Sequence, residues 1–193
     1  MSSLLKMSAK LHLTADHLVL AYEVVNPDTR DAYLLNRLYR TVPAWDLSAD
    51  VIYIHLDPKT ETVWLNKKLA DLPDGDRITS PVAPFVTPLR AMSSFREKVK
   101  LPLPVQEYRQ YGMGPEDDTD DEPVLGPRVY RHVYFTLGYY WQPEGTIEKT
   151  QDVQGRAVVL PQTPPGVPLE FGELRTHRER LDIPVLVPAA AGC

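Results

Sequence analysis

The chain is poor in cysteine, since only Cys193, the last of its 193 residues, carries a thiol. A single cysteine excludes an intramolecular disulfide and the zinc sites that use paired cysteines. It is also typical of a reducing compartment, so we predict a cytoplasmic protein. The sequence lacks both the run of about 20 apolar residues that a membrane-spanning helix requires and the shorter run of a secretory signal. We therefore expect a soluble protein with no membrane partner.

The chain has fewer positively than negatively charged residues: 21 Lys and Arg against 26 Asp and Glu, which gives a formal net charge of −5. Binding to nucleic acid generally needs a dense cationic surface, so we predict no nucleic-acid partner, although a local basic patch is compatible with this composition. The sequence contains no G-x-S-x-G nucleophile motif and no glycine-rich phosphate loop. We accordingly predict no cofactor and no metal site, and we favour a protein that is not an enzyme.

Glycine is scarce beside proline, with 10 glycines and 19 prolines. This is roughly twice the usual proline content, and proline in β-proteins is confined to strand ends, edges and bulges. Between the prolines, apolar and polar residues alternate with the period of two that is typical of half-buried strands. The clearest examples are residues 10–25 and 51–66, each predicted to form a hairpin, 129–141, predicted to form the strongest strand, and 181–187, predicted to form an edge strand.

About eight short strands without helix–strand alternation predict one all-β, mainly antiparallel domain over residues 1–193. The spacing of apolar residues within 89–99 allows at most one short helix. The pattern resembles that of immunoglobulin-like β-sandwiches of bacteria, with a closed β-barrel as the alternative. This resemblance concerns architecture and implies no function. Residues 113–127 are predicted to form an acidic surface loop, and residues 189–193 a flexible tail.

Tyrosine and histidine alternate with apolar residues on two of the predicted strands. Tyr53 and His55 share one face of the first, and Tyr130, His132 and Tyr134 share one face of the second. If the strands are neighbours, these side chains could line a ligand-binding or catalytic face. The alternative is an ordinary water-tolerant sheet face, because both residue types combine an apolar body with a polar tip.

Two further clusters lie near strand ends. Tyr139, Tyr140 and Trp141 offer a large area for contact with a partner, or else close the end of a sandwich. The segment 175–180 holds three arginines and His177, which suit anion recognition, but Glu173 and Glu179 lie among them and favour a self-neutralised turn. Neither cluster has the spacing of a known motif.

From these features we predict an interaction or assembly module that binds a protein partner or a second copy of itself. The prediction depends on the proline-bearing last strand and on the aromatic residues 139–141. The competing hypothesis is a small-molecule-binding or enzymatic protein that uses the face lined by tyrosine and histidine. The two differ in whether His55 and His132 lie within reach of one ligand.

Overall fold

The computed structural model describes residues 4–40, 45–70, 84–108 and 125–188, which form thirteen strands. In chain order they are β1 (Lys6–Leu13), β2 (His17–Val25), β3 (Ala32–Arg37), β4 (Tyr53–Asp57), β5 (Thr62–Lys67), β6 (Phe85–Leu89), β7 (Ser94–Pro102), β8 (Val105–Gln106), β9 (Leu125–Trp141), β10 (Ile147–Val153), β11 (Arg156–Gln162), β12 (Phe171–Arg175) and β13 (Glu179–Pro188). The described part of the chain contains no helix, and so none that could cross a bilayer.

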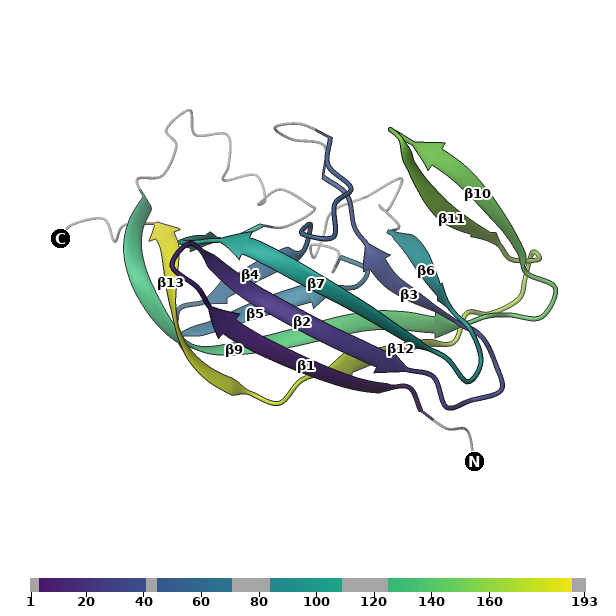
Figure 1. The fold of residues 1–193 in the computed structure, drawn as a ribbon, viewed down its shortest axis with the longest axis horizontal. Coiled ribbons are helices and arrows are strands. Elements are labelled where there is room, and N and C mark those ends of the chain that lie inside the picture. Colours follow the sequence, from purple (N-terminus) through teal and green to yellow (C-terminus); the bar gives the residue numbers. More distant parts are fainter. Residues whose placement is uncertain (1–3, 41–44, 71–83, 109–124, 189–193) are drawn as a thin grey trace.

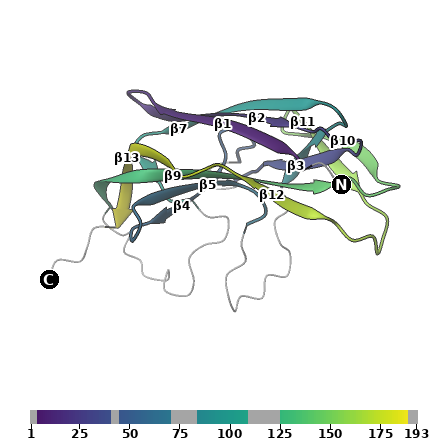
Figure 2. The same ribbon diagram turned by 90° about the horizontal axis from the view of Figure 1, so that it is seen from below.

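The strands form two sheets that lie one above the other (Figures 1 and 2). The small sheet has the order β1-β2-β7 and is antiparallel throughout. The large sheet follows the path β10-β11-β6-β3-β9-β13-β8, with β12 and β5 also paired to β9, and β4 paired to β5. Because this path has two ends, the sheet does not close within the described residues. The all-β, mostly antiparallel prediction is confirmed, and the closed-barrel alternative is wrong.

The 17-residue strand β9 is the centre of the large sheet. One of its edges pairs with β13 and then β12, and the other pairs with β5 in parallel and with β3 in antiparallel orientation. Alternate residues of β9, such as Val133, Phe135 and Leu137, are fully buried against the small sheet's Leu18 and Leu20. One apolar core therefore joins both sheets.

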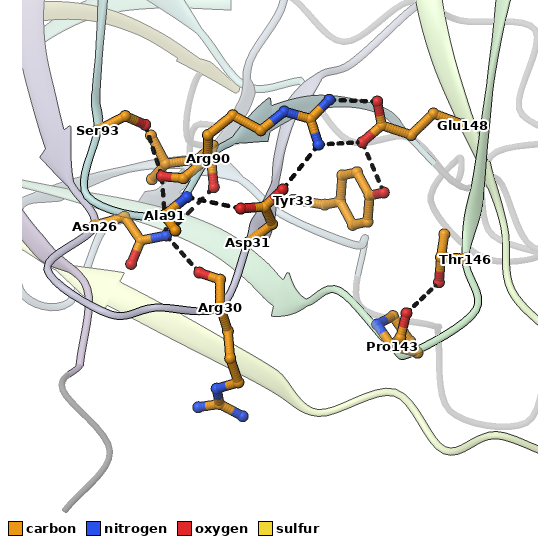
Figure 3. A network of polar contacts seen from close by, with 11 residues as sticks. Asn26, Arg30, Asp31, Tyr33, Arg90, Ala91, Ser93, Pro143, Thr146 and Glu148 are labelled. Atoms are coloured by element: carbon orange, nitrogen blue, oxygen red, sulfur yellow. Dashed lines mark hydrogen bonds and ion pairs between the residues drawn. The ribbon is translucent and has the colours of Figure 1, made fainter.

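The hairpin β10–β11 projects from one end of the large sheet and pairs with β6 (Figure 1). A polar cluster fastens it there (Figure 3): the Arg90 guanidinium donates to both Glu148 carboxylate oxygens, at 2.8 and 2.6 Å, and to Asp31 at 2.9 Å. The Tyr33 hydroxyl donates to Glu148 at 2.9 Å. Side chains from β3, β10 and the end of β6 thus meet at one point.

The hairpins predicted within 10–25 and 51–66 are confirmed as β1–β2 and β4–β5. The short helix allowed near 89–99 is wrong, because those residues end β6 and begin β7, and the positive φ of 55° at Met92 lies in the turn between them. An apolar spacing of three or four over one turn does not distinguish a helix from two strand ends.

The last strand is not an edge strand as predicted, since β13 pairs with β9 on one side and with β8 at Val185 and Leu186 on the other. Of the predicted loop 113–127, residues 125–127 begin β9, and residues 113–124 lie outside the described part. The predicted tail 189–193 lies outside it as well.

Candidate functional site

The side of β4, β5 and β9 that faces away from the main core carries three cross-strand rows of polar and aromatic residues. Strand register places His55 opposite Trp64, and Trp64 opposite Tyr134. The flanking rows are Tyr53, Asn66 and Thr136 on one side and Asp57, Thr62 and His132 on the other. The strand that carries Tyr53 and His55 is not a neighbour of the strand that carries His132 and Tyr134, because β5 lies between them.

Trp64 and Tyr134 form the centre of this side. Their rings are stacked, with centroids 4.5 Å apart and an interplanar angle of 15°, and both side chains are half-buried. The guanidinium of Arg175, on β12, lies 5.5 Å from the centre of the Trp64 ring, a cation–π geometry. We call the set of the half-buried Trp64 and Tyr134 with the exposed His55 and Arg175 the aromatic face.

The two histidines differ in environment. His55 is exposed, and its Nδ1 lies 2.8 Å from Glu107 Oε1. His132 is half-buried, and its Nδ1 makes no hydrogen bond to any described residue. Partial burial, together with the positive charges of Arg178 and Arg180, lowers the pKa of His132 below its ordinary value. His132 is therefore neutral at pH 7, when its imidazole can accept or donate one hydrogen bond at each nitrogen.

Tyr130 does not share a face with Tyr134, contrary to the sequence prediction. The amides of Arg131 and His132 both donate to the carbonyl of Glu61, at 3.0 and 3.1 Å, and the pairing of β9 with β13 shifts register between Arg180 and Ile183. The ladder is therefore irregular at this point of β9. The alternation of side chains is interrupted at this irregularity, and Tyr130 lies in the main core at 2% exposure. Its hydroxyl has no hydrogen-bond partner among the described residues, and burial raises its pKa.

Tyr53 remains on the predicted side of its strand but is buried. It packs with Leu38 and Val51 in a small apolar cluster, with the Tyr108 ring 6.0 Å away between centroids. Its ring offers little surface to a ligand. Of the five residues predicted to bind a ligand, His55, His132 and Tyr134 thus remain on an accessible face.

The aromatic strand end is interior, whereas exposed rings were expected of a partner site. Tyr139 and Trp141 belong to the main core, and Tyr140 packs with Tyr33 on the other side of the sheet; none is more than 7% exposed. These rings lie on both sides of β9 and pack against elements that are distant in sequence. The sequence pattern alone does not reveal those neighbours. The alternative role of closing the sandwich fits this burial.

A buried ionic cluster, missed in the sequence, lies between the two sheets. Lys67 has no exposed side-chain surface, and its Nζ donates to Glu97 Oε2 at 2.7 Å and to the carbonyls of Ala49 and Asn36 at 2.7 and 3.2 Å. The Tyr22 hydroxyl donates to the same Glu97 oxygen at 2.6 Å. Burial lowers the pKa of Lys67, although the Glu97 carboxylate opposes the shift. No local sequence signal marks this pair, because β5 and β7 are far apart in the chain.

In the described residues, no three His, Cys, Asp or Glu side chains are grouped closely enough to hold a metal ion. Comparison with known proteins finds no matching family model and no significantly similar curated protein or solved structure, so the site is interpreted from its own geometry.

Proposed function

We propose that the protein is a non-enzymatic interaction or assembly module that binds a protein partner through the aromatic face. The observation that carries the proposal is the stacked pair of Trp64 and Tyr134 beside Arg175, accessible on the outer side of a sheet. Tryptophan, tyrosine and arginine are the residues most enriched among those that dominate binding energy at protein interfaces.

Preorganisation supports this role. The two rings stand on neighbouring strands in fixed register and restrain one another by stacking. Binding then costs less side-chain entropy than it would for freely rotating rings. The exposed His55 extends the row by one strand, so the three side chains offer a contiguous contact strip.

We infer that an immunoglobulin-like sandwich architecture serves this binding role. Two sheets that enclose one core, as in immunoglobulin-like sandwiches, form a rigid frame that presents side chains on its outer faces. We also propose a cytoplasmic location, because a chain with one cysteine gains nothing from an oxidising compartment.

A small-ligand or enzymatic role for the same face is the second candidate. The observation that favours it is the His55–Glu107 pair at 2.8 Å, next to Trp64, because a carboxylate that orients an imidazole is a common general-base arrangement. In this case a bound small molecule would cover Trp64, and native mass spectrometry would detect a mass excess that disappears on denaturation.

The test of the proposal compares Arg175→Glu and Trp64→Ala with Met92→Ala, which truncates a largely exposed side chain elsewhere. We expect each change in the aromatic face to weaken association about tenfold or more, as for residues that dominate an interface, and Met92→Ala to leave it unchanged. Association is measured by quantitative affinity capture from the native host and by sedimentation velocity for self-association.

Arg175→Glu separates binding from folding, because its side chain is exposed and its replacement leaves the core intact. The urea midpoint of each variant is measured alongside. If all variants capture the same partners in the same amounts as the wild type, the aromatic face is not the interface and the proposal fails.

A further inference from the structure

The outer face of the small sheet is strongly basic. Along each strand, successive side chains point alternately to the core and to the outer face of the sheet. On β2, Leu18, Leu20 and Tyr22 belong to the main core, whereas the intervening Val19 and Ala21 do not. On the two flanking strands the residues of this outer face are charged and exposed. They are Lys6, Lys10 and His12 on β1, and Arg96, Lys98 and Lys100 on β7.

Strand register arranges these residues as a groove. Ala21 lies between Lys10 and Lys98, and Val19 lies between His12 and Lys100. Short side chains on the central strand form the floor, and long cationic side chains on the outer strands form the walls, roughly two strand spacings or 10 Å apart. A hollow of about 500 Å³ occupies this place and is lined by Ser8, Lys10, Ala21, Glu23, Arg96 and Lys98, among others. We call it the basic groove.

The charge of the groove opposes that of the whole chain. This face holds five Lys or Arg residues and one carboxylate, Glu23, which pairs with Arg96 at 2.9 Å. Lys10, Lys98 and Lys100 form no ion pair with any residue that the structure describes. The chain nevertheless carries a formal net charge of −5. Like charges gathered at such spacing repel one another, and an anionic partner would relieve that repulsion.

We propose that the basic groove binds an extended acidic segment of a partner protein. On β7, cations stand at every second residue, at 96, 98 and 100, which gives a repeat of about 6.8 Å along the strand. An extended peptide with carboxylates at every second residue has the same repeat. The apolar floor at Ala21 contacts the backbone of such a peptide, while the lysine walls meet its carboxylates.

A protein segment fits this groove better than nucleic acid does. Proteins that bind single strands combine cationic grooves with aromatic side chains on which the bases stack. The described residues of this outer face include no phenylalanine, tyrosine or tryptophan, because Phe95 and Tyr22 pack toward the core. The surface is also distinct from the aromatic face, which lies on the large sheet, so the two can be tested separately.

The test is fluorescence anisotropy of a labelled short peptide in which Glu alternates with Ala, titrated with the full-length protein at low and moderate salt. We expect saturable binding that weakens with salt. The double variant Lys10→Glu/Lys98→Glu should bind at least about tenfold more weakly, because both walls reverse their charge. Ala21→Tyr should also weaken binding, since it fills the floor without altering charge.

The matched control is Lys59→Glu/Lys149→Glu, which changes the net charge equally at two exposed lysines outside the groove. It should bind within about twofold of the wild type at moderate salt, where distant charges are screened. An equal loss in the control, or the absence of saturable binding to the wild type, would overturn the proposal.

Two further outcomes would also overturn it. Tighter binding of a single-stranded oligonucleotide of equal charge would identify a nucleic-acid surface. A concentration-dependent dimer that Lys10→Glu/Lys98→Glu dissolves in sedimentation velocity would identify the occupant as a second copy of the chain. Unchanged urea midpoints of the groove variants show that any loss of binding arises at the groove.

Discussion

Lys67 is the residue whose environment departs most from that expected of its type. A lysine with no exposed side-chain surface loses the water that would hydrate its ammonium group. The carboxylate of Glu97 and two backbone carbonyls accept hydrogen bonds from the ammonium group in place of that water. Glu97 also receives hydrogen bonds from Tyr22 and Asn36 and lies 3.3 Å from Arg37, so four side chains of the described residues, that of Lys67 included, share its charge. The pair holds β5 against β7 across the two sheets. Removing one member leaves the other buried and only partly compensated.

We predict that Lys67→Met lowers the free energy of unfolding by about 3 kcal/mol, because Glu97 then keeps its burial but loses its shortest cationic contact. Lys67→Met/Glu97→Gln should be more stable than this single variant, since the unpaired charge is gone. Urea denaturation measures both. Lys68→Met, at the neighbouring and partly exposed lysine, serves as control. A single variant as stable as the wild type would show that the ion pair contributes nothing to the fold.

The hairpin β10–β11 is the element with the weakest attachment. Its backbone joins the sheet at Val159 opposite Val86, and its residues are mostly exposed. The Arg90–Glu148 pair is bidentate, but the Arg90 side chain is half-exposed, so solvent reduces its value. The Arg90 hydrogen bonds lower the pKa of Glu148. Their contribution is therefore present above the ordinary pKa of a glutamate and is lost as the pH falls through the lowered one.

We predict that Arg90→Ala lowers the free energy of local opening of β10–β11 by roughly 1 kcal/mol and leaves β9 unaffected. The pair fastens only this hairpin, so global stability should change little. Amide hydrogen exchange followed by mass spectrometry reads both segments in one experiment. Lys149→Ala, an exposed change on the same strand, controls for loss of charge. Faster exchange throughout β9 would mean that the cluster supports the whole sheet.

The molecule as a whole has one main core shared by two sheets. Tyr22 of the small sheet and Phe135 of the large sheet contact each other with centroids 4.9 Å apart, in a cluster that includes residues of β1, β2, β3, β5, β7, β9 and β13. Neither sheet has a separate core of comparable size among the described residues. The two sheets should therefore fold and unfold together.

We predict that Phe135→Ala costs about 3–5 kcal/mol and that both sheets still unfold in a single transition, because the cavity lies between them. Far-UV and near-UV circular dichroism should give the same urea midpoint. Val129→Ala, at an exposed position of the same strand, should cost far less. Separate transitions for the two probes would show that the small sheet is an independent unit.

The sequence predicted the local part of this fold correctly, because strand periodicity and turn chemistry act between near neighbours. The β4–β5 hairpin follows from the strand pattern of Val51–Leu56 and the Asp57-Pro58 turn, and the structure forms it between Tyr53–Asp57 and Thr62–Lys67. The same alternation placed His55 and Tyr134 on the accessible side. These features require no knowledge of what lies across the sheet.

Tertiary structure decided the rest. The irregularity at Arg131 and His132 involves the carbonyl of Glu61, in the turn before β5, and a register shift in the pairing with β13, and beside it Tyr130 lies in the core. Trp64 completes the aromatic face only because β5 pairs in parallel with β9, a long-range choice that no local pattern encodes. The Lys67–Glu97 pair and the basic groove likewise arise from strands brought together across the chain. Pairing between distant strands is settled by the packing of the whole core, and a single sequence does not display it.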